Sequence, residues 1–211
     1  MNLIELLISF IISFGLLMIA MVIHEFSHAL VASKLGDNTA KYSGRLTLNP
    51  LAHIDLFWTI LLPLTLFLTS GGRFIFGSAK PVPINYWALK NPKRDMILVG
   101  AAGPLSNLAF AIILTLILRF FPLPGILISI TLNLIVINVI LGVFNLFPLP
   151  PLDGSRILMG ILPEHLANRY AQIESYGFFI LLGLMFLGIL NKIIWPPVML
   201  VLRLLGIPNP F

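Results

Sequence analysis

The sequence has no cysteine, and only 10% of its 211 residues are charged. Without cysteine the chain can form no disulfide and has neither a catalytic thiol nor a thiolate metal ligand, which leaves histidine, aspartate and glutamate as possible metal ligands. The chain holds only four histidines and eight acidic residues. Its basic residues lie in short connections, not on a face interleaved with aromatic residues, so the net charge of +5 does not indicate nucleic-acid binding.

Apolar side chains, in contrast, are in large excess. Hydrophobic residues make up 58% of the chain and its mean hydropathy is +1.01, which is too apolar for one water-soluble core of this size. We therefore predict an integral membrane protein. The first apolar stretch begins with Asn2 and Glu5 where a signal peptide would carry lysine or arginine, so we expect it to be retained and not cleaved.

Several apolar segments could enter a bilayer. They are residues 3–32, 54–69, 96–118, 126–147 and 176–190. Crossing ~30 Å of hydrocarbon takes about 20 helical residues, so the first, third and fourth segments are long enough, and the last can span if its flanks help. The second is short and is interrupted by Pro63. The tail, residues 193–205, contains Pro196-Pro197 and is expected to be a re-entrant or interfacial piece, not a clean span.

Basic residues indicate which connections are cytoplasmic. They cluster in residues 34–45 and 73–94, whereas the next connection has only Arg119. By the positive-inside rule, the chain from residue 34 to residue 94 is cytoplasmic. The short apolar segment at residues 54–69 lies between the two basic clusters, so we expect it to dip into the membrane and return without crossing.

The region between the first and second long helices also contains two strand-like pieces, residues 45–48 and 81–84, with glycines as helix breakers between them. We therefore predict an all-α polytopic membrane protein with four to six membrane helices. A short re-entrant or extended region is expected between the two metal-binding motifs described next.

The residues His24, Glu25 and His28 stand at the end of the first long apolar run. Residues four apart on a helix share a face about 6 Å apart along the axis, so both imidazoles can bind one Zn²⁺ while Glu25 reaches a water molecule beside the ion. A charged group at mid-bilayer costs at least about 2.5 kcal/mol, which makes these residues functional candidates. The alternative is a polar cluster that holds helices together by hydrogen bonds.

A catalytic zinc ion usually takes three protein ligands, so a third is needed. Asp153 is the candidate, because it follows the run Pro148-Leu149-Pro150-Pro151-Leu152, which cannot continue a helix. We expect this run to be extended, with backbone groups available to a bound extended peptide. If residues 54–69 do not cross the membrane, the next two helices bring Asp153 back to the side on which His28 lies.

These motifs together resemble the site-2 protease family of intramembrane zinc metalloproteases. The resemblance rests on residues 24–28, on Gly103-Pro104-Leu105-Ser106-Asn107 and on residues 145–154, and it covers about residues 19–157. It implies that His24, His28 and Asp153 bind one Zn²⁺, that Glu25 is the catalytic base, and that Asn145 helps to hold the substrate strand. The sequence has no connection long enough for a PDZ domain and no nucleotide-sensing module, so it resembles a short subgroup.

Each of three further polar residues has two possible roles. His53 could reach the site as an oxyanion donor or a substrate contact, or it could be an interfacial histidine. Asp55 could assist it, or could cap the helix that follows. Asn107, like Asn145, could hydrogen-bond a substrate backbone, or could join two membrane helices.

We therefore expect a zinc-dependent intramembrane endopeptidase that hydrolyses peptide bonds in or near transmembrane segments of membrane proteins. The expected arrangement is one membrane-embedded domain over residues 1–211, with a catalytic core of about residues 3–157 and C-terminal membrane helices in residues 158–211. Its partners would be a membrane-protein substrate and the lipid bilayer, and its expected location is the cell membrane, with the site opening toward the cytoplasm. The alternatives are a metalloprotease acting on soluble or juxtamembrane peptides, a metal-binding transporter and an inactive scaffold.

Overall fold

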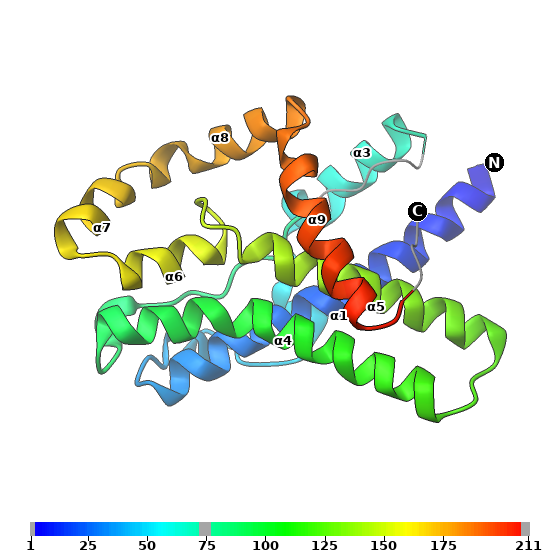
Figure 1. Cartoon of the computed structure of the whole chain (residues 1–211), viewed down its shortest axis with the longest axis horizontal. Coiled ribbons are helices and arrows are strands. Elements are labelled where there is room, and N and C mark those ends of the chain that lie inside the picture. Colours follow the sequence, from blue (N-terminus) through cyan, green and yellow to red (C-terminus); the bar gives the residue numbers. More distant parts are fainter. Residues whose placement is uncertain (1–2, 72–76, 208–211) are drawn as a thin grey trace.

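The computed structural model describes residues 3–71 and 77–207, and all regular secondary structure in these two ranges is helical (Figure 1). The helices are α1 (Leu3–Lys34), α2 (Thr39–Tyr42), η1 (Pro50–His53), η2 (Leu56–Leu61), α3 (Leu62–Thr69), η3 (Tyr86–Ala88), α4 (Pro92–Phe120), α5 (Gly125–Asn145), α6 (Asp153–Ile161), α7 (Glu164–Ala171), α8 (Glu174–Phe186) and α9 (Ile189–Leu204). The prediction of an all-α protein is confirmed.

Three helices, α1, α4 and α5, are long and apolar enough to cross a membrane. They pack against one another in the lower half of Figure 1, and α6 packs along α4. The pair α8 and α9 is also apolar enough to span, but it is bent by 84° at the break between the two helices. The described residues therefore contain three candidate membrane spans, or four if the bent pair counts as one, and only the count of four reaches the predicted range of four to six.

The break in the C-terminal pair lies at Gly188, not at the two prolines. Gly188 has a φ of +67°, a left-handed conformation that glycine adopts without steric cost, and it ends one helix and starts the next. The expectation that Pro196-Pro197 would break residues 193–205 is wrong, because α9 continues through both. Its buried stripe, Leu190, Ile194, Val198 and Leu202, packs into the main apolar core and holds the helix together while the prolines stay exposed.

The connection between α1 and α4 holds the short helices η1, η2 and α3. The apolar helix over Leu56–Thr69 is shorter than a membrane span, in agreement with the expectation that it does not cross. Asp55 caps its start, because Asp55 Oδ1 accepts hydrogen bonds from the N–H groups of Phe57 and Trp58 at 3.0 and 2.9 Å. The strand-like residues 45–48 contain bends at 46–48 and no strand. Residues 77–85 contain neither a helix nor a turn and lead into η3.

Candidate active site

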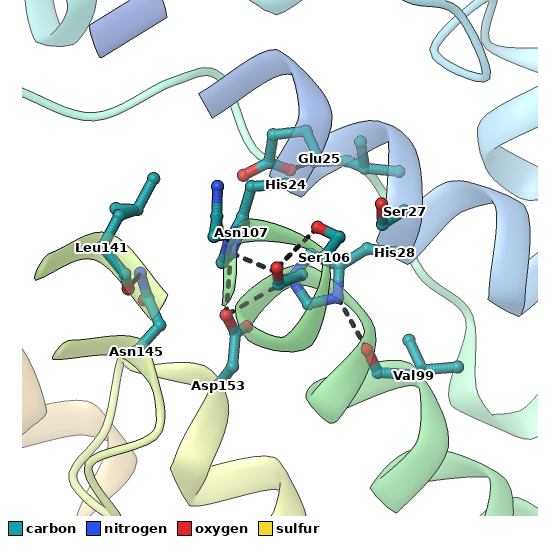
Figure 2. A network of polar contacts seen from close by, with 12 residues as sticks. His24, Glu25, Ser27, His28, Val99, Ser106, Asn107, Leu141, Asn145 and Asp153 are labelled. Atoms are coloured by element: carbon teal, nitrogen blue, oxygen red, sulfur yellow. Dashed lines mark hydrogen bonds and ion pairs between the residues drawn. The ribbon is translucent and has the colours of Figure 1, made fainter. Parts of the chain in front are cut away.

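The three predicted ligand residues meet at one point in the structure. His24 and His28 are buried on one face of α1, one turn apart, and Asp153 is the first residue of α6. His24 Nε2 lies 2.9 Å from Asp153 Oδ2 and 3.1 Å from His28 Nε2, and His28 Nε2 lies 3.2 Å from the same carboxylate oxygen. Figure 2 shows the two imidazoles and the carboxylate converging.

The outer nitrogens of both imidazoles are held by the surrounding helices. His28 Nδ1 lies 2.7 Å from the carbonyl oxygen of Val99, which can only accept a hydrogen bond, so Nδ1 carries the proton. His24 Nδ1 lies 2.6 Å from Asn107 Oδ1. The Asn107 Nδ2 group donates to Ala20 O at 3.0 Å and to Asn138 Oδ1 at 2.8 Å, which fixes the orientation of the amide and makes His24 Nδ1 the donor.

When both imidazoles are neutral, these contacts leave the two inward-facing Nε2 atoms without a proton. Two nitrogen lone pairs and a carboxylate oxygen then face one another across 2.9–3.2 Å. Such an arrangement is repulsive unless a cation lies between the three atoms. A tetrahedral zinc ion with bonds of 2.0–2.1 Å separates its ligand atoms by about 3.3 Å, so this donor set fits one Zn²⁺.

Gly103 of α4 packs directly against the two imidazole rings. A Cβ atom built at Gly103 would lie 2.3 Å from His28 Nε2 and 2.6 Å from His24 Nε2, well inside van der Waals contact. Only glycine therefore lets α4 approach the two imidazoles this closely. Sequence reasoning noted Gly103 only as part of a motif; a glycine that precedes Pro104 inside an apolar helix was the one available signal.

Glu25 extends from the same turn of α1 toward a cavity of about 460 Å³. Its Oε2 atom accepts a hydrogen bond from the backbone N–H of Val82 at 2.8 Å. The cavity walls combine the polar residues His24, Asp153 and Asn145 with apolar side chains of α1, α5 and α8 and with Trp58. One wall is closed by Trp58 and Phe178, whose rings meet edge to face at 5.9 Å.

Asn145, the last residue of α5, lines the cavity as expected for a residue that contacts substrate. Asn107 and His53 do not. Asn107 has no exposed surface, and its side-chain amide is hydrogen-bonded to His24, Ala20 and Asn138, so it orients the His24 imidazole and joins helices. His53 is also fully buried, with its Nε2 atom 2.9 Å from Thr47 O. Neither residue is therefore placed in the cavity wall, where a substrate contact was expected.

The proline-rich run before Asp153 also differs from its expected extended form. The N–H of Leu149 bonds to Phe147 O, and the N–H of Leu152 bonds to Leu149 O, both at 2.8 Å. The run is therefore folded into turns, and these two donors are already used within it. Its role is to end α5 and to turn Asp153 back toward α1, so the prediction that it pairs with a bound strand loses its basis.

Comparison with known proteins assigns the chain to a family. The model of peptidase family M50 matches residues 10–131 and 123–188. The chain belongs to peptidase family M50, the site-2 protease family. This M50 protein is 40% identical over 189 residues to the "Putative zinc metalloprotease YwhC" of Bacillus subtilis, with 85% of the chain and 82% of YwhC covered.

More distant relatives carry similar names. The chain is 31% identical to the "Putative zinc metalloprotease Rip2" of Mycobacterium tuberculosis, over 82% of the chain and 66% of Rip2. It is 30% identical to the "Zinc metalloprotease MJ0392" of Methanocaldococcus jannaschii, over 77% of the chain and 36% of that protein. No solved structure matches the chain. The M50 protein is thus a membrane-embedded zinc metalloprotease.

Proposed function

We propose that this M50 protein is an intramembrane endopeptidase in which His24, His28 and Asp153 hold the zinc ion and Glu25 is the general base. The observation that carries the proposal is the convergence of three ligand atoms, two from membrane helix α1 and one from the start of α6, beside a glutamate that lines the same cavity. Neither zinc transport nor a scaffold role requires Glu25 at that position.

The reaction proposed is hydrolysis of a peptide bond. Bound at this site, zinc would supply a Lewis acid that activates a water molecule and polarises the scissile carbonyl. Glu25 would take the proton from the attacking water and pass it to the leaving amine. A helical substrate hides its carbonyl groups in hydrogen bonds, so it must unwind in the cavity. There Asn145 would hold the unwound backbone, and the apolar walls would receive its side chains.

The depth of the site supports a substrate within the membrane. At 1.5 Å per residue, His28 and His24 lie about 9 and 15 Å along α1 from Lys34, the last residue of that helix. We propose that Lys34 lies at the cytoplasmic face of the cell membrane and that water enters from there.

The C-terminal helices are proposed to belong to the same domain as the catalytic core, since Val198 and Leu202 of α9 pack in one apolar cluster with Val139 of α5.

Cysteine labelling tests this orientation. Lys41 and Lys90 are both exposed, in the two basic stretches on either side of α3. Because the chain has no cysteine of its own, a single Lys41→Cys or Lys90→Cys substitution gives a clean signal. With an impermeant thiol reagent, both should be labelled only from the cytoplasmic side. Pro122→Cys, in the exposed connection from α4 to α5, should be labelled from outside. Labelling of Lys41→Cys and Lys90→Cys from opposite sides would contradict the topology.

The proposed activity predicts cleavage that depends on both zinc and the unwinding of the substrate. The purified protein in lipid vesicles should cut a reporter with a single transmembrane helix that contains an Asn-Gly break, and a chelator should abolish the cut until zinc is restored. The same reporter with Leu-Leu at the break should be cut more slowly, because its helix is harder to unwind. Cleavage of only soluble peptides, or zinc binding with cleavage of neither reporter, would refute intramembrane proteolysis.

A further inference from the structure

Residues 81–83 read Pro-Val-Pro, in the connection between the two metal-binding motifs. Proline has no backbone N–H, so Val82 carries the only backbone donor in this stretch. The structure directs that single donor to Glu25: Val82 N lies 2.8 Å from Glu25 Oε2, although the two residues are 57 positions apart. Because each residue that precedes a proline is restricted to extended conformations, the stretch is also stiff.

Hydrogen bonds to the rest of the protein hold the connection on both sides of this contact. On one side Lys80 N–H donates to His53 O at 2.8 Å, and on the other Asn85 N–H donates to the buried Asp37 carboxylate at 2.7 Å. Between them the Val82 side chain is buried against Ala29 of α1 and against Ala40. The Val82 N–H group is therefore held in place by the protein whether or not Glu25 accepts its hydrogen bond.

We propose that this connection, residues 80–85, is the positioning element of the general base. The inference rests on the proposed function of Glu25. A glutamate side chain has several rotamers, and a charge-assisted hydrogen bond from a fixed donor selects one of them. The bond occupies Oε2 and leaves Oε1 to exchange a proton in the cavity. Val82 acts through Glu25 and does not contact the substrate, so its N–H should affect kcat and leave KM and zinc content unchanged.

Hydrogen exchange tests the contact itself, independently of activity. The prolines make Val82 the only exchangeable backbone amide in residues 81–83, so its exchange, followed at this single amide by NMR, reports on one hydrogen bond. In the zinc-loaded protein, Glu25→Ala should speed the exchange of Val82 at least about tenfold, whereas Glu25→Gln keeps an acceptor oxygen and should preserve the protection. Asp37→Ala is the matched control, since it should expose the Asn85 amide and leave that of Val82 protected. Unchanged exchange of Val82 in Glu25→Ala would overturn the proposal.

Kinetics then separate positioning from packing. Val82→Pro removes the donor in a stretch that is already extended, and should lower kcat by about 10- to 100-fold, the usual cost of losing a group that orients a catalytic residue. Val82→Ala keeps the N–H and shortens the buried side chain, so it should lower thermal stability more than kcat. If Val82→Pro does not fold, a backbone ester at Val82 removes the same donor and keeps the side chain.

Two results would overturn this inference alone. One is full kcat in the Val82→Pro or ester variant while Glu25→Gln is inactive, and the other is an equal loss of kcat in Val82→Ala and Val82→Pro. Full activity of Glu25→Gln would instead refute the proposed function of Glu25, so the two failures are distinguishable. A combined Glu25→Gln, Val82→Pro variant should be no slower than Glu25→Gln, because residue 25 is then no longer a base whose position affects proton transfer.

Discussion

Glu25→Gln is expected to keep its zinc and to lose a factor of 10² or more in kcat, the typical contribution of a general base. Glutamine has nearly the shape of glutamate and can still accept the Val82 hydrogen bond, but it cannot take a proton from water. His24→Ala, His28→Ala and Asp153→Ala should behave differently. Each leaves only two of the three converging ligand atoms, so zinc content and cleavage should fall together.

Both quantities can be measured on the same preparations, by metal analysis and by cleavage of the transmembrane reporter. Matched controls lie on α7: Glu164→Gln and His165→Ala make the same chemical changes at exposed positions outside the cavity and should alter neither quantity. Full cleavage by Glu25→Gln would refute the general-base assignment. Full zinc content in Asp153→Ala would refute Asp153 as the third ligand.

Gly103→Ala is expected to abolish zinc binding although it removes no ligand. The added methyl group would lie 2.3 Å from His28 Nε2 and 2.6 Å from His24 Nε2, at the point toward which both lone pairs are directed. Neither imidazole can withdraw easily, because each Nδ1 is bonded to a buried acceptor. We expect zinc content and cleavage to fall together, as they do when a ligand is lost.

The loss expected for Gly103→Ala is the opposite of what helix propensity predicts. Alanine is a better helix former than glycine by about 1 kcal/mol, so propensity alone would favour the substitution. Gly15→Ala in α1 is the control, since a Cβ there meets no atom within 4 Å, and it should retain zinc and activity. A zinc-loaded, active Gly103→Ala variant would show that α4 can move away from the imidazoles.

Local sequence patterns predicted the parts of the protein that depend on neighbouring residues. The spacing of His24 and His28 puts both on one face of a helix, and apolar length gives α1, α4 and α5 as spans. Asp55 was correctly read as a possible cap, because capping involves only the next three residues. The prediction from Pro196-Pro197 was wrong, because the packing of α9 against the core outweighs the helix hydrogen bonds that the two prolines cannot form.

The sequence by itself determined that this protein lies in a membrane and which few residues could bind a metal, because hydropathy and ligand chemistry are properties of the residues themselves. Only the tertiary structure decided how Asn107, Gly103 and Val82 act. Asn107 orients His24, Gly103 makes room for both imidazoles, and Val82 holds Glu25. Each of these roles is a contact between residues more than 50 positions apart. The periodicity of a single sequence does not predict which distant group a given side chain will contact.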